Sequence, residues 1–456
     1  MEPKSSDDNA PLRGAEDLVS VFHAAEKPPH AFLLGAEAEK FGVHEQTGAP
    51  LAYSGEHGVE RVLAALTRFG WQPERETQDG PVIALRRGAS SVTLEPGAQL
   101  ELSGAAVPDV HEVHAEFVQH MIELGDISKE MRLAWLGVGF HPIATQAQLP
   151  WVPKQRYGIM REYLPPLGSA AHDMMRRTAT VQVNIDYSSE EDAMRKLRVG
   201  LLVSPLLNAL TANSPFSEGT RSNKKSLRGN VWLHMDPLRT GLVRRVLSKK
   251  RAGYRDYAEW ALDAGMFLLK RNGGVLANTG QTFRDFLENG FQGERATAGD
   301  WKLHLNTLFP EVRLKNTLEL RSCDCLPLRF SASVPALAAG IFYDERALAE
   351  AETLAETMGA ESVDQARSDL VSHGLAASIG GVPARALAER LLEIARGGLE
   401  RRARIDARGQ TESVHLEALI ALVHEGKAPA DELIEGVAEG AALPVAELIR
   451  RTRVDG

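Results

Sequence analysis

The fold is decided by residues 32–41, which read FLLGAEAEKF. In a β-strand, successive side chains point to opposite faces, so Glu37 and Glu39 project to the same side. Two carboxylates held this close repel each other unless a cation lies between them. The segment therefore predicts a strand that begins with apolar residues in the core and then presents an acidic face suited to a cation.

Three further segments show the same alternation, and we expect a strand from each. They read LEPGAQLELS at residues 94–103, TVQVNIDY at 180–187 and RLKNTLELR at 313–321. Apolar side chains take one face of each expected strand, and polar side chains take the other. The polar side chains contributed by these segments are Glu95, Gln99, Glu101, Ser103, Gln182, Asn184, Asp186, Thr317, Glu319 and Arg321.

The types of polar residue separate two interpretations of these strands. One face of an antiparallel sheet commonly lies in water, where Thr, Lys and paired opposite charges predominate. Here the polar set contains several carboxylates, three amides and an arginine. Mg²⁺ prefers oxygen ligands and commonly bridges carboxylates to substrate phosphates. A solvated face remains the alternative, and our hypothesis is a nucleotide-dependent reaction on this face.

Missing motifs narrow the kind of nucleotide site. The sequence has no GxxxxGK[ST] loop and no GxGxxG following a strand, so neither a P-loop nor a Rossmann crossover is supported. It also lacks a GxSxG nucleophile elbow and a Cys-rich zinc motif. Phosphate binding would therefore depend on metal held by the sheet carboxylates.

The composition along the chain predicts three regions. Residues 1–28 are a polar lead-in with a short helical stretch near 15–25. Residues 29–343 mix alternating and helical segments, which is an α+β pattern typical of one catalytic domain. Residues 344–456 are rich in Ala, Glu, Leu and Arg, and amphipathic helices are expected at 346–358, 382–403 and 414–424, packed on the catalytic body.

Charge and hydropathy exclude two classes of partner. The 456 residues carry a formal net charge of −9, which argues against nucleic acid as a partner. No apolar stretch approaches the ~20 residues of a membrane helix, so no membrane partner is expected. The lead-in has neither the apolar core of a secretory signal nor the acid-poor, Arg-rich character of a transit peptide. We therefore expect a cytoplasmic protein.

Two groups of residues receive an ordinary structural interpretation. Cys323 and Cys325 are the only cysteines, which suits a reducing compartment, and we interpret them as buried or idle thiols. His111, His114 and His120 have helical spacing but lack the HExxH arrangement of a zinc site. We expect these histidines on an ordinary helix surface.

The chain resembles the plant-type glutamate–cysteine ligases, a family shared by plants and many proteobacteria. Residues 34–42 are similar to the family segment G-T-E-x-E-K-F-G, residues 94–104 to L-E-P-G-G-Q-x-E-L-S-G, and residues 152–160 to M-P-K-x-R-Y-x-I-M. The resemblance extends over nearly the whole chain. It continues through the segments 174–216, 226–232, Asp236 with 239–241, 318–321 and 397–402.

The resemblance implies a fold and a reaction. The implied fold is glutamine-synthetase-like, with an antiparallel sheet curved into a funnel, helices around it and a helical C-terminal region. The implied enzyme uses ATP to phosphorylate the side-chain carboxylate of glutamate and then joins it to the amine of cysteine. This makes γ-glutamylcysteine in the first step of glutathione synthesis. Mg²⁺ is the implied cofactor, the partners are glutamate, cysteine and ATP, and a monomer or a homodimer fits equally.

The resemblance also implies roles for individual residues. Planar guanidinium groups suit carboxylates and phosphates, and carboxylates suit Mg²⁺. The implied magnesium ligands are Glu37, Glu39, Glu95, Glu101 and Glu319. The implied contacts to glutamate carboxylates are Arg156 and Arg228, the phosphate contacts are Arg239 and Arg321, and the site is lined by Gln182 and Asn184.

The chain departs from the family pattern at two places. Ala36 and Ala38 replace more usual polar residues beside the paired glutamates, and residues 322–326 stand where the family has a Gly-rich, Cys-free turn. The regulatory disulfides of the plant enzymes cannot be transferred, because no matching pair of distant cysteines exists.

Two alternatives to the implied function stay open. One is the same chemistry with another amine or acid, and the other is a non-catalytic nucleotide- or metal-binding protein on the same fold. The retained carboxylates argue against the second, because unused and mutually repelling charges destabilise a protein.

Overall fold

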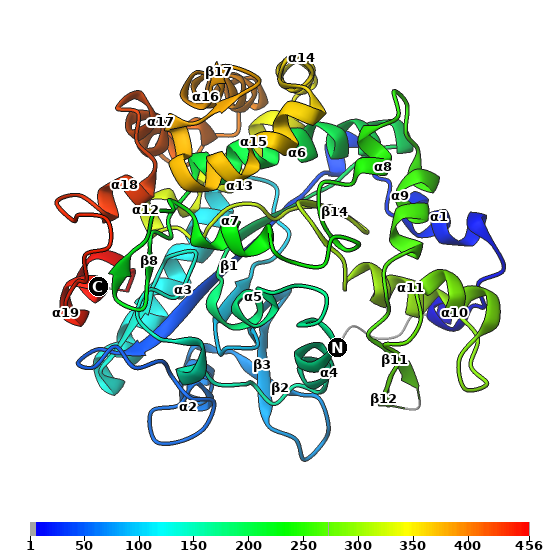
Figure 1. Ribbon diagram of the computed structural model, residues 1–456, viewed down its shortest axis with the longest axis horizontal. Coiled ribbons are helices and arrows are strands. Elements are labelled where there is room, and N and C mark those ends of the chain that lie inside the picture. The colour runs from blue at the N-terminus through cyan, green and yellow to red at the C-terminus, as the bar shows by residue number, and fades with distance from the viewer. Residues whose placement is uncertain (1–5, 272, 456) are drawn as a thin grey trace.

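A nine-stranded antiparallel sheet runs through the computed structural model, which describes residues 6–271 and 273–455 (Figure 1). The strand order is β14-β15-β7-β1-β5-β4-β3-β2, and β6 pairs with the far end of β1. The strands are β1 (Leu34–His44), β2 (Gln72–Arg75), β3 (Val82–Arg87), β4 (Ser90–Leu94), β5 (Leu100–Ser103), β6 (Leu133–Leu136), β7 (Val181–Ile185), β14 (Val312–Leu314) and β15 (Leu318–Leu320).

The register of the sheet gathers the predicted polar side chains on one face. Directly opposed residues on adjacent strands project to the same side, so opposed polar residues form rows across the sheet. The rows are Thr93, Glu101 and Glu39; Ser103, Glu37 and Gln182; and Asn184, Glu319 and Arg313. Four separate stretches of sequence therefore supply one continuous polar surface.

The opposite face of the sheet is apolar and is covered by helices. Val183 and Leu318 are fully buried on this face. Helices α3 (Val110–Met131), α6 (Glu190–Leu210) and α13 (Ser333–Phe342) pack against these strands. Each buried Leu in such a layer contributes about 2–5 kcal/mol relative to Ala, so this layer fixes the register on which the polar rows depend.

The segment 313–321 corrects one expectation. It does not form a single strand, because the backbone turns between β14 and β15, where Lys315 N donates to Thr317 O at 2.8 Å. The alternation is nevertheless preserved on both sides of the turn. Arg313 consequently lies opposite Glu319 rather than further along the same strand.

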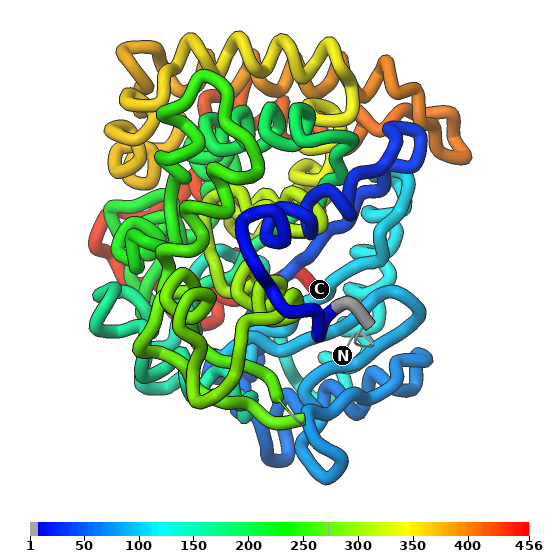
Figure 2. The backbone as a smooth tube through the Cα atoms, turned by 90° about the vertical axis from the view of Figure 1, so that its right-hand side faces the viewer, coloured from blue at the N-terminus to red at the C-terminus, as the bar shows by residue number. Residues whose placement is uncertain are grey.

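The helices that follow residue 343 pack against the rest of the molecule, and the first of them form the layer of yellow and orange tubes at the top of Figure 2. Helix α15 packs on α6, and α16 packs on α13 and α14. These helices are α14 (Glu345–Met358), α15 (Ala360–His373), α16 (Ala384–Arg402), α17 (Glu417–His424), α18 (Pro429–Leu433) and α19 (Val445–Thr452). The predicted helices at 346–358, 382–403 and 414–424 are therefore confirmed, the last with a 3₁₀ turn at Glu412–Leu416.

Shorter elements surround the sheet. Residues 15–25 contain the expected helix, α1 (Ala15–His23). The other helices are α2 (Val59–Leu66), α4 (Gln155–Tyr163), α5 (Ala171–Arg177), α7 (Leu227–Trp232), α8 (Arg244–Leu247), α9 (Tyr254–Leu262), α10 (Phe283–Asn289), α11 (Ala298–Leu305) and α12 (Leu328–Ser331). The paired short strands are β8 (Phe216–Ser217) with β9 (Thr220–Arg221), β10 (Thr240–Gly241) with β13 (Phe309–Pro310), β11 (Leu268–Arg271) with β12 (Gly274–Ala277), and β16 (Ser378–Ile379) with β17 (Val382–Pro383). None of the helices in the described residues is long and apolar enough to span a membrane.

The histidines of α3 only partly follow the prediction. The helix itself is confirmed, but His120 is 1% exposed, and neither of its ring nitrogens has a hydrogen-bond partner. The expectation of a surface position is wrong for His120, because the face of α3 on which it lies packs against the sheet. His111 and His114 are half-buried beside His415.

Candidate active site

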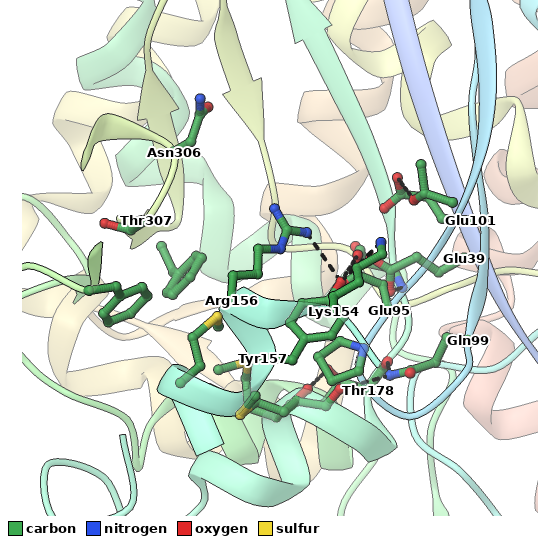
Figure 3. A pocket seen from close by; sticks show the side chains of 18 of the residues that line it. Glu39, Glu95, Gln99, Glu101, Lys154, Arg156, Tyr157, Thr178, Asn306 and Thr307 are labelled. Carbon is green, nitrogen blue, oxygen red and sulfur yellow. Dashed lines mark hydrogen bonds between the residues drawn. The ribbon is translucent and has the colours of Figure 1, made fainter. Parts of the chain in front are cut away.

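A cavity of about 560 Å³ lies on the polar face of the sheet. Its volume suits a ligand of nucleotide size. In Figure 3, Glu39, Glu95 and Glu101 lie on one side, Asn306 and Thr307 lie on the other, and Arg156 lies between them. The predicted residues that line the cavity are Glu37, Glu39, Glu95, Glu101, Arg156, Gln182, Arg228, Glu319 and Arg321.

Two predicted residues do not line the cavity. Asn184 lies behind its wall, where its Nδ2 donates to Glu37 Oε1 at 3.1 Å, so it orients that carboxylate. Arg239 is completely buried, and its guanidinium donates to Asp236, to Thr307 O and to a third acceptor, the backbone oxygen of Gly265. Each of its three nitrogens donates to a protein acceptor, and the side chain is fully buried outside the cavity lining. Arg239 therefore holds Thr307 in the cavity wall, and the phosphate contact expected of Arg239 stays a prediction.

Four carboxylates form what we call the acidic half of the site: Glu37, Glu39, Glu95 and Glu101. Burial raises the pKa of Glu39 well above its usual range, and the nearby charges of Glu95 and Glu101 raise it further. Burial and the charges of Glu37 and Glu95 raise the pKa of Glu101 to about 7, although Ser103 and Thr93 donate hydrogen bonds to it. These carboxylates form no ion pair within the described residues, so a cation would relieve their repulsion.

A second group of charges forms what we call the balanced half: Arg313, Lys315, Glu319 and Arg321. Glu319 Oε2 lies 2.6 Å from Arg313 Nε and 3.6 Å from Lys315 Nζ, and Oε1 lies 3.1 Å from Arg321 Nη1. Burial alone would raise the pKa of Glu319, but these three cations hold it below its usual range. Glu319 is therefore already neutralised by protein groups.

The acidic half fits a metal that arrives with its ligand. No three His, Cys, Asp or Glu side chains of residues 6–271 and 273–455 converge closely enough to form a ready metal cage. Mg²⁺ in phosphoryl-transfer sites is usually held by only one or two carboxylates together with substrate phosphates, and it keeps several waters. Carboxylates that share one cavity and raise each other's pKa match that mode of binding, because a bound cation would favour their ionised forms.

A tight turn places Glu95 at the cavity. Glu95 N donates to Gln99 O, and Ala98 N donates to Glu95 O, both at 2.9 Å. A side chain at Gly97 would meet the backbone oxygen of Arg176 at 2.5 Å, so only glycine fits there. The Pro96-Gly97 pair therefore lets the chain turn against α5 and present Glu95.

Helix α4 and the residue before it supply a basic wall. Lys154 is buried, and its Nζ donates to Leu94 O at 2.6 Å. Burial and the neighbouring charge of Arg156 lower the pKa of Lys154 to about 8. Arg156 Nη2 donates to Tyr157 Oη at 3.1 Å. The sequence interpretation missed Lys154 and Tyr157, although both lie in the 152–160 segment that it singled out.

Helix α7 supplies Arg228. The helix begins after Ser226, whose side chain accepts from Gly229 N at 2.8 Å. Arg228 Nη1 donates to Ser322 O at 3.0 Å, and Nη2 donates to Arg321 O at 2.6 Å. The backbone after β15 therefore fixes the guanidinium at the cavity edge.

An aromatic wall was also missed from the sequence. Trp232, Phe267 and Phe309 line the cavity, and the rings of Trp232 and Phe309 lie 6.1 Å apart. Their residue types carry no signal that separates a cavity wall from an ordinary core. Of these three residues, only Trp232 lies in a segment that resembles the plant-type family, residues 226–232.

The divergent segment 322–326 has a structural role. Cys323 and Cys325 are buried and unpaired, as expected, and burial raises their pKa values to about 11 and about 12. The Cys325 thiol donates to Glu39 O at 2.8 Å. Asp324 accepts hydrogen bonds from the Ser214 and Ser226 hydroxyls, which ties the segment to the start of α7. Protonated, buried thiols are poor nucleophiles, so the segment supports the site rather than reacting in it.

An antiparallel sheet that gathers carboxylates and arginines in one cavity is the arrangement expected of the glutamine-synthetase-like carboxylate–amine ligases. The model of glutamate-cysteine ligase family 2 matches residues 33–447. The chain belongs to this family.

Individual relatives agree with this assignment. The chain is 37% identical over 422 residues to glutamate–cysteine ligase B, chloroplastic, of Oryza sativa subsp. japonica, covering 92% of this chain and 83% of that one. It is 38% identical over 423 residues to glutamate–cysteine ligase, chloroplastic, of Brassica juncea, covering 92% and 80%. A crystal structure of glutamate–cysteine ligase from Francisella tularensis in complex with AMP has the same fold, with a TM-score of 0.55, 12% identity and coverage of 92% and 88%.

The relatives correct the expected location. The plant relatives are chloroplastic, and this finding contradicts the cytoplasmic location expected from the sequence. The composition of residues 1–28 was therefore an unsound basis for naming a compartment.

Proposed function

We propose that this chain is a magnesium-dependent ligase that uses ATP to join the side-chain carboxylate of glutamate to the amine of cysteine. The observation that carries the proposal is that Glu37, Glu39, Glu101 and Glu319 line one cavity together with four arginines. Membership of glutamate-cysteine ligase family 2 supports the choice of substrates.

The proposed chemistry explains why both charges are needed. A carboxylate does not form an amide efficiently at neutral pH without activation. The side-chain carboxylate of glutamate therefore attacks the terminal phosphorus of ATP, ADP leaves, and a γ-glutamyl phosphate forms. The amine of cysteine then attacks the acyl carbon, and phosphate leaves as the amide bond forms. Bound Mg²⁺ would spread the negative charge of the phosphates during transfer.

Each half of the site has a proposed role. Glu37, Glu39, Glu95 and Glu101 would hold the metal with the phosphates. Glu319 would face them from the balanced half, where it also positions Arg321. Arg321 Nη1 donates to Gln182 Oε1 at 2.6 Å, so its guanidinium is held at the boundary of the two halves, where a transferring phosphoryl group would lie.

The glutamate substrate is assigned to Arg156 of the basic wall and to Arg228 of α7. Arg156 and Arg228 both line the cavity, and a guanidinium makes paired hydrogen bonds to a carboxylate. The Arg228 guanidinium donates to the backbone oxygens of Ser322 and Arg321. A substrate carboxylate would therefore neutralise a buried cation that has no ion-pair partner within the described residues.

The nucleotide base is assigned to the opposite end of the cavity. Phe267, Leu268, Val275 and Leu303 give that end apolar surface, and Asn306 adds an amide beside it. This combination suits a planar heterocycle with hydrogen-bonding edges. It also leaves the phosphates pointing toward the acidic half.

The proposed organisation keeps the three predicted regions. Residues 29–343 would be the catalytic domain, 344–456 a helical region packed on it, and 1–28 a lead-in. A monomer and a homodimer remain equally compatible with the proposal, and neither nucleic acid nor a membrane is proposed as a partner.

Phosphate release from ATP tests the proposal. Purified protein would be supplied with Mg²⁺, glutamate and each of a panel of amines in turn. Turnover that requires both glutamate and cysteine is expected. Turnover only with a different amine would replace cysteine in the proposal, and the absence of phosphate release with every pair would refute it.

A further inference from the structure

A second cavity, of about 300 Å³, lies between the catalytic body and helix α15. It is formed by the loop after α7, by α8 and α9, and by α15, whose positions can be followed in Figure 1. Its volume is at the lower end of the range for small-molecule sites. It shares one wall residue with the active-site cavity, because Trp232 lines both.

The lining of this cavity carries excess positive charge. It contains Arg244, Arg245 and Arg367 against Asp263 and Asp364. Asp263 is also neutralised by a residue outside the lining, Arg284, at 2.8 Å. Within residues 6–271 and 273–455, Arg245 forms no ion pair, whereas Arg244 is paired with Asp364. An exposed cation at a concave site attracts a small anion.

A chain of hydrogen bonds joins this cavity to the active site. Arg367 Nη2 donates to Glu311 Oε1 at 2.7 Å, and Ser322 Oγ donates to Glu311 Oε2 at 2.9 Å. The backbone oxygen of the same Ser322 accepts from Arg228 at 3.0 Å. Arg321 N also donates to Glu311 O at 3.1 Å. Glu311 therefore connects Arg367 of the second cavity to Arg228 and Arg321 of the active site.

We propose that the second cavity is a regulatory site for a small oxyanion, a carboxylate or a phosphate, held by Arg245 and Arg367. A bound oxyanion competes with Glu311 for Arg367. The Glu311 carboxylate then holds Ser322 less firmly, and Arg228, which donates to Ser322 O, loses part of its support. The consequence for catalysis rests on the proposed function, whereas the binding event does not.

Calorimetry with metal-free protein tests the binding. Sulfate serves as the phosphate-like probe and malonate as the carboxylate probe, and all titrations use the Arg156→Ala variant to weaken anion binding in the active-site cavity. We expect one of the two probes to bind, and Arg245→Ala to weaken that binding about 10-fold, the loss of one charge-assisted contact. Lys250→Ala is the matched control, because Lys250 belongs to the same basic run but does not line the cavity.

The outcomes separate the possibilities. Binding of sulfate alone assigns a phosphate-like ligand, and binding of malonate alone assigns a carboxylate. Binding that is unchanged in Arg245→Ala, or equally weakened by Lys250→Ala, would overturn the site. So would the absence of binding by both probes.

Steady-state kinetics test the coupling. We expect the probe that binds to raise the KM for glutamate at least ~5-fold, the lower end of typical allosteric coupling. Glu311→Gln should abolish this effect while calorimetry still detects the anion. A KM that responds equally in Glu311→Gln would contradict the coupling through Glu311. A protein without ligase activity would refute the proposed function and leave the calorimetric result standing.

Discussion

The acidic half and the balanced half of the active site lie on the same sheet face but treat charge in opposite ways. In the acidic half, Glu37, Glu39 and Glu101 oppose one another, and their pKa values are raised. In the balanced half, Glu319 is surrounded by three cations, and its pKa is lowered. The carboxylates of the acidic half therefore have no cationic side chain paired with them, and this is where we expect a ligand cation. In the balanced half, the protein's own cations neutralise Glu319.

The largest expected effect is the loss of catalysis when the acidic half is broken. Glu39→Ala should reduce magnesium-dependent phosphate release by at least ~100-fold, comparable to losing a principal electrostatic contact in a transition state. Circular dichroism and thermal melting should remain close to those of the parent protein, because the carboxylate contributes repulsion to the metal-free fold. Glu60→Ala, on the exterior helix α2, is the control. Turnover of Glu39→Ala within threefold of the parent would remove Glu39 from the metal site.

The balanced half should respond in the opposite sense, through stability. Arg313→Met removes the closest partner of buried Glu319 and should lower the free energy of unfolding by about 3 kcal/mol. The buried Glu319 carboxylate would then have only Lys315 and Arg321 to compensate its charge. Urea denaturation measures this change. The double variant with Glu319→Gln should recover most of the lost stability. If Arg313→Met left the midpoint unchanged, the ion pairs around Glu319 would have no structural importance.

A smaller effect should appear in the pH dependence of the metal-free protein. The pKa of Glu101 is raised from the usual 4.5 to about 7, so the folded state binds a proton more tightly than the unfolded state. The stability contributed by this proton is fully present below about pH 4.5 and is lost as the pH rises to about 7. With chelator present, Glu101→Gln should abolish a change on the order of 2–3 kcal/mol across this range. An identical slope in both proteins would show that Glu101 is ionised normally.

The smallest effect is expected from Cys325, which contacts the backbone of Glu39 in the acidic half. Its thiol is buried and donates to Glu39 O, and burial raises its pKa to about 12. Cys325→Ser should keep activity within about threefold, because a hydroxyl still donates to that oxygen, and stability should fall by only about 1 kcal/mol. Activity of the parent should not depend on added reductant. Strong inactivation by mild oxidants that Cys325→Ser prevents would contradict the assignment of an inert thiol.

The sequence predicted much of this contrast because alternation determines which side chains share a face. Glu37 with Glu39, and Gln182 with Asn184, were placed on common faces by period-two patterning alone, and the sheet register agrees. The type of residue then indicated a cation on that face. Both inferences are local, and local periodicity is the strongest signal a single sequence contains.

The remaining features depend on contacts between distant segments. The sequence does not show whether an arginine is already neutralised, so Arg239 was assigned to phosphate although Asp236 and two backbone oxygens occupy it. It also gave no sign that the chain would reverse after Leu314 and bring Arg313 against Glu319. Lys154 was passed over because its role follows from the nearness of Leu94 O, which is 60 positions away in the chain.

The most direct test concerns how the acidic half acquires its cation. Mn²⁺ binding would be followed by electron paramagnetic resonance, with and without a non-hydrolysable ATP analogue, in the parent protein and in Glu39→Ala. We predict tight Mn²⁺ binding only when the nucleotide is present, and at least ~10-fold weaker binding in the variant, since a missing carboxylate leaves the metal with too few oxygen ligands. Equally tight binding without nucleotide, or unchanged binding in Glu39→Ala, would contradict the idea that phosphates and these carboxylates hold the metal together.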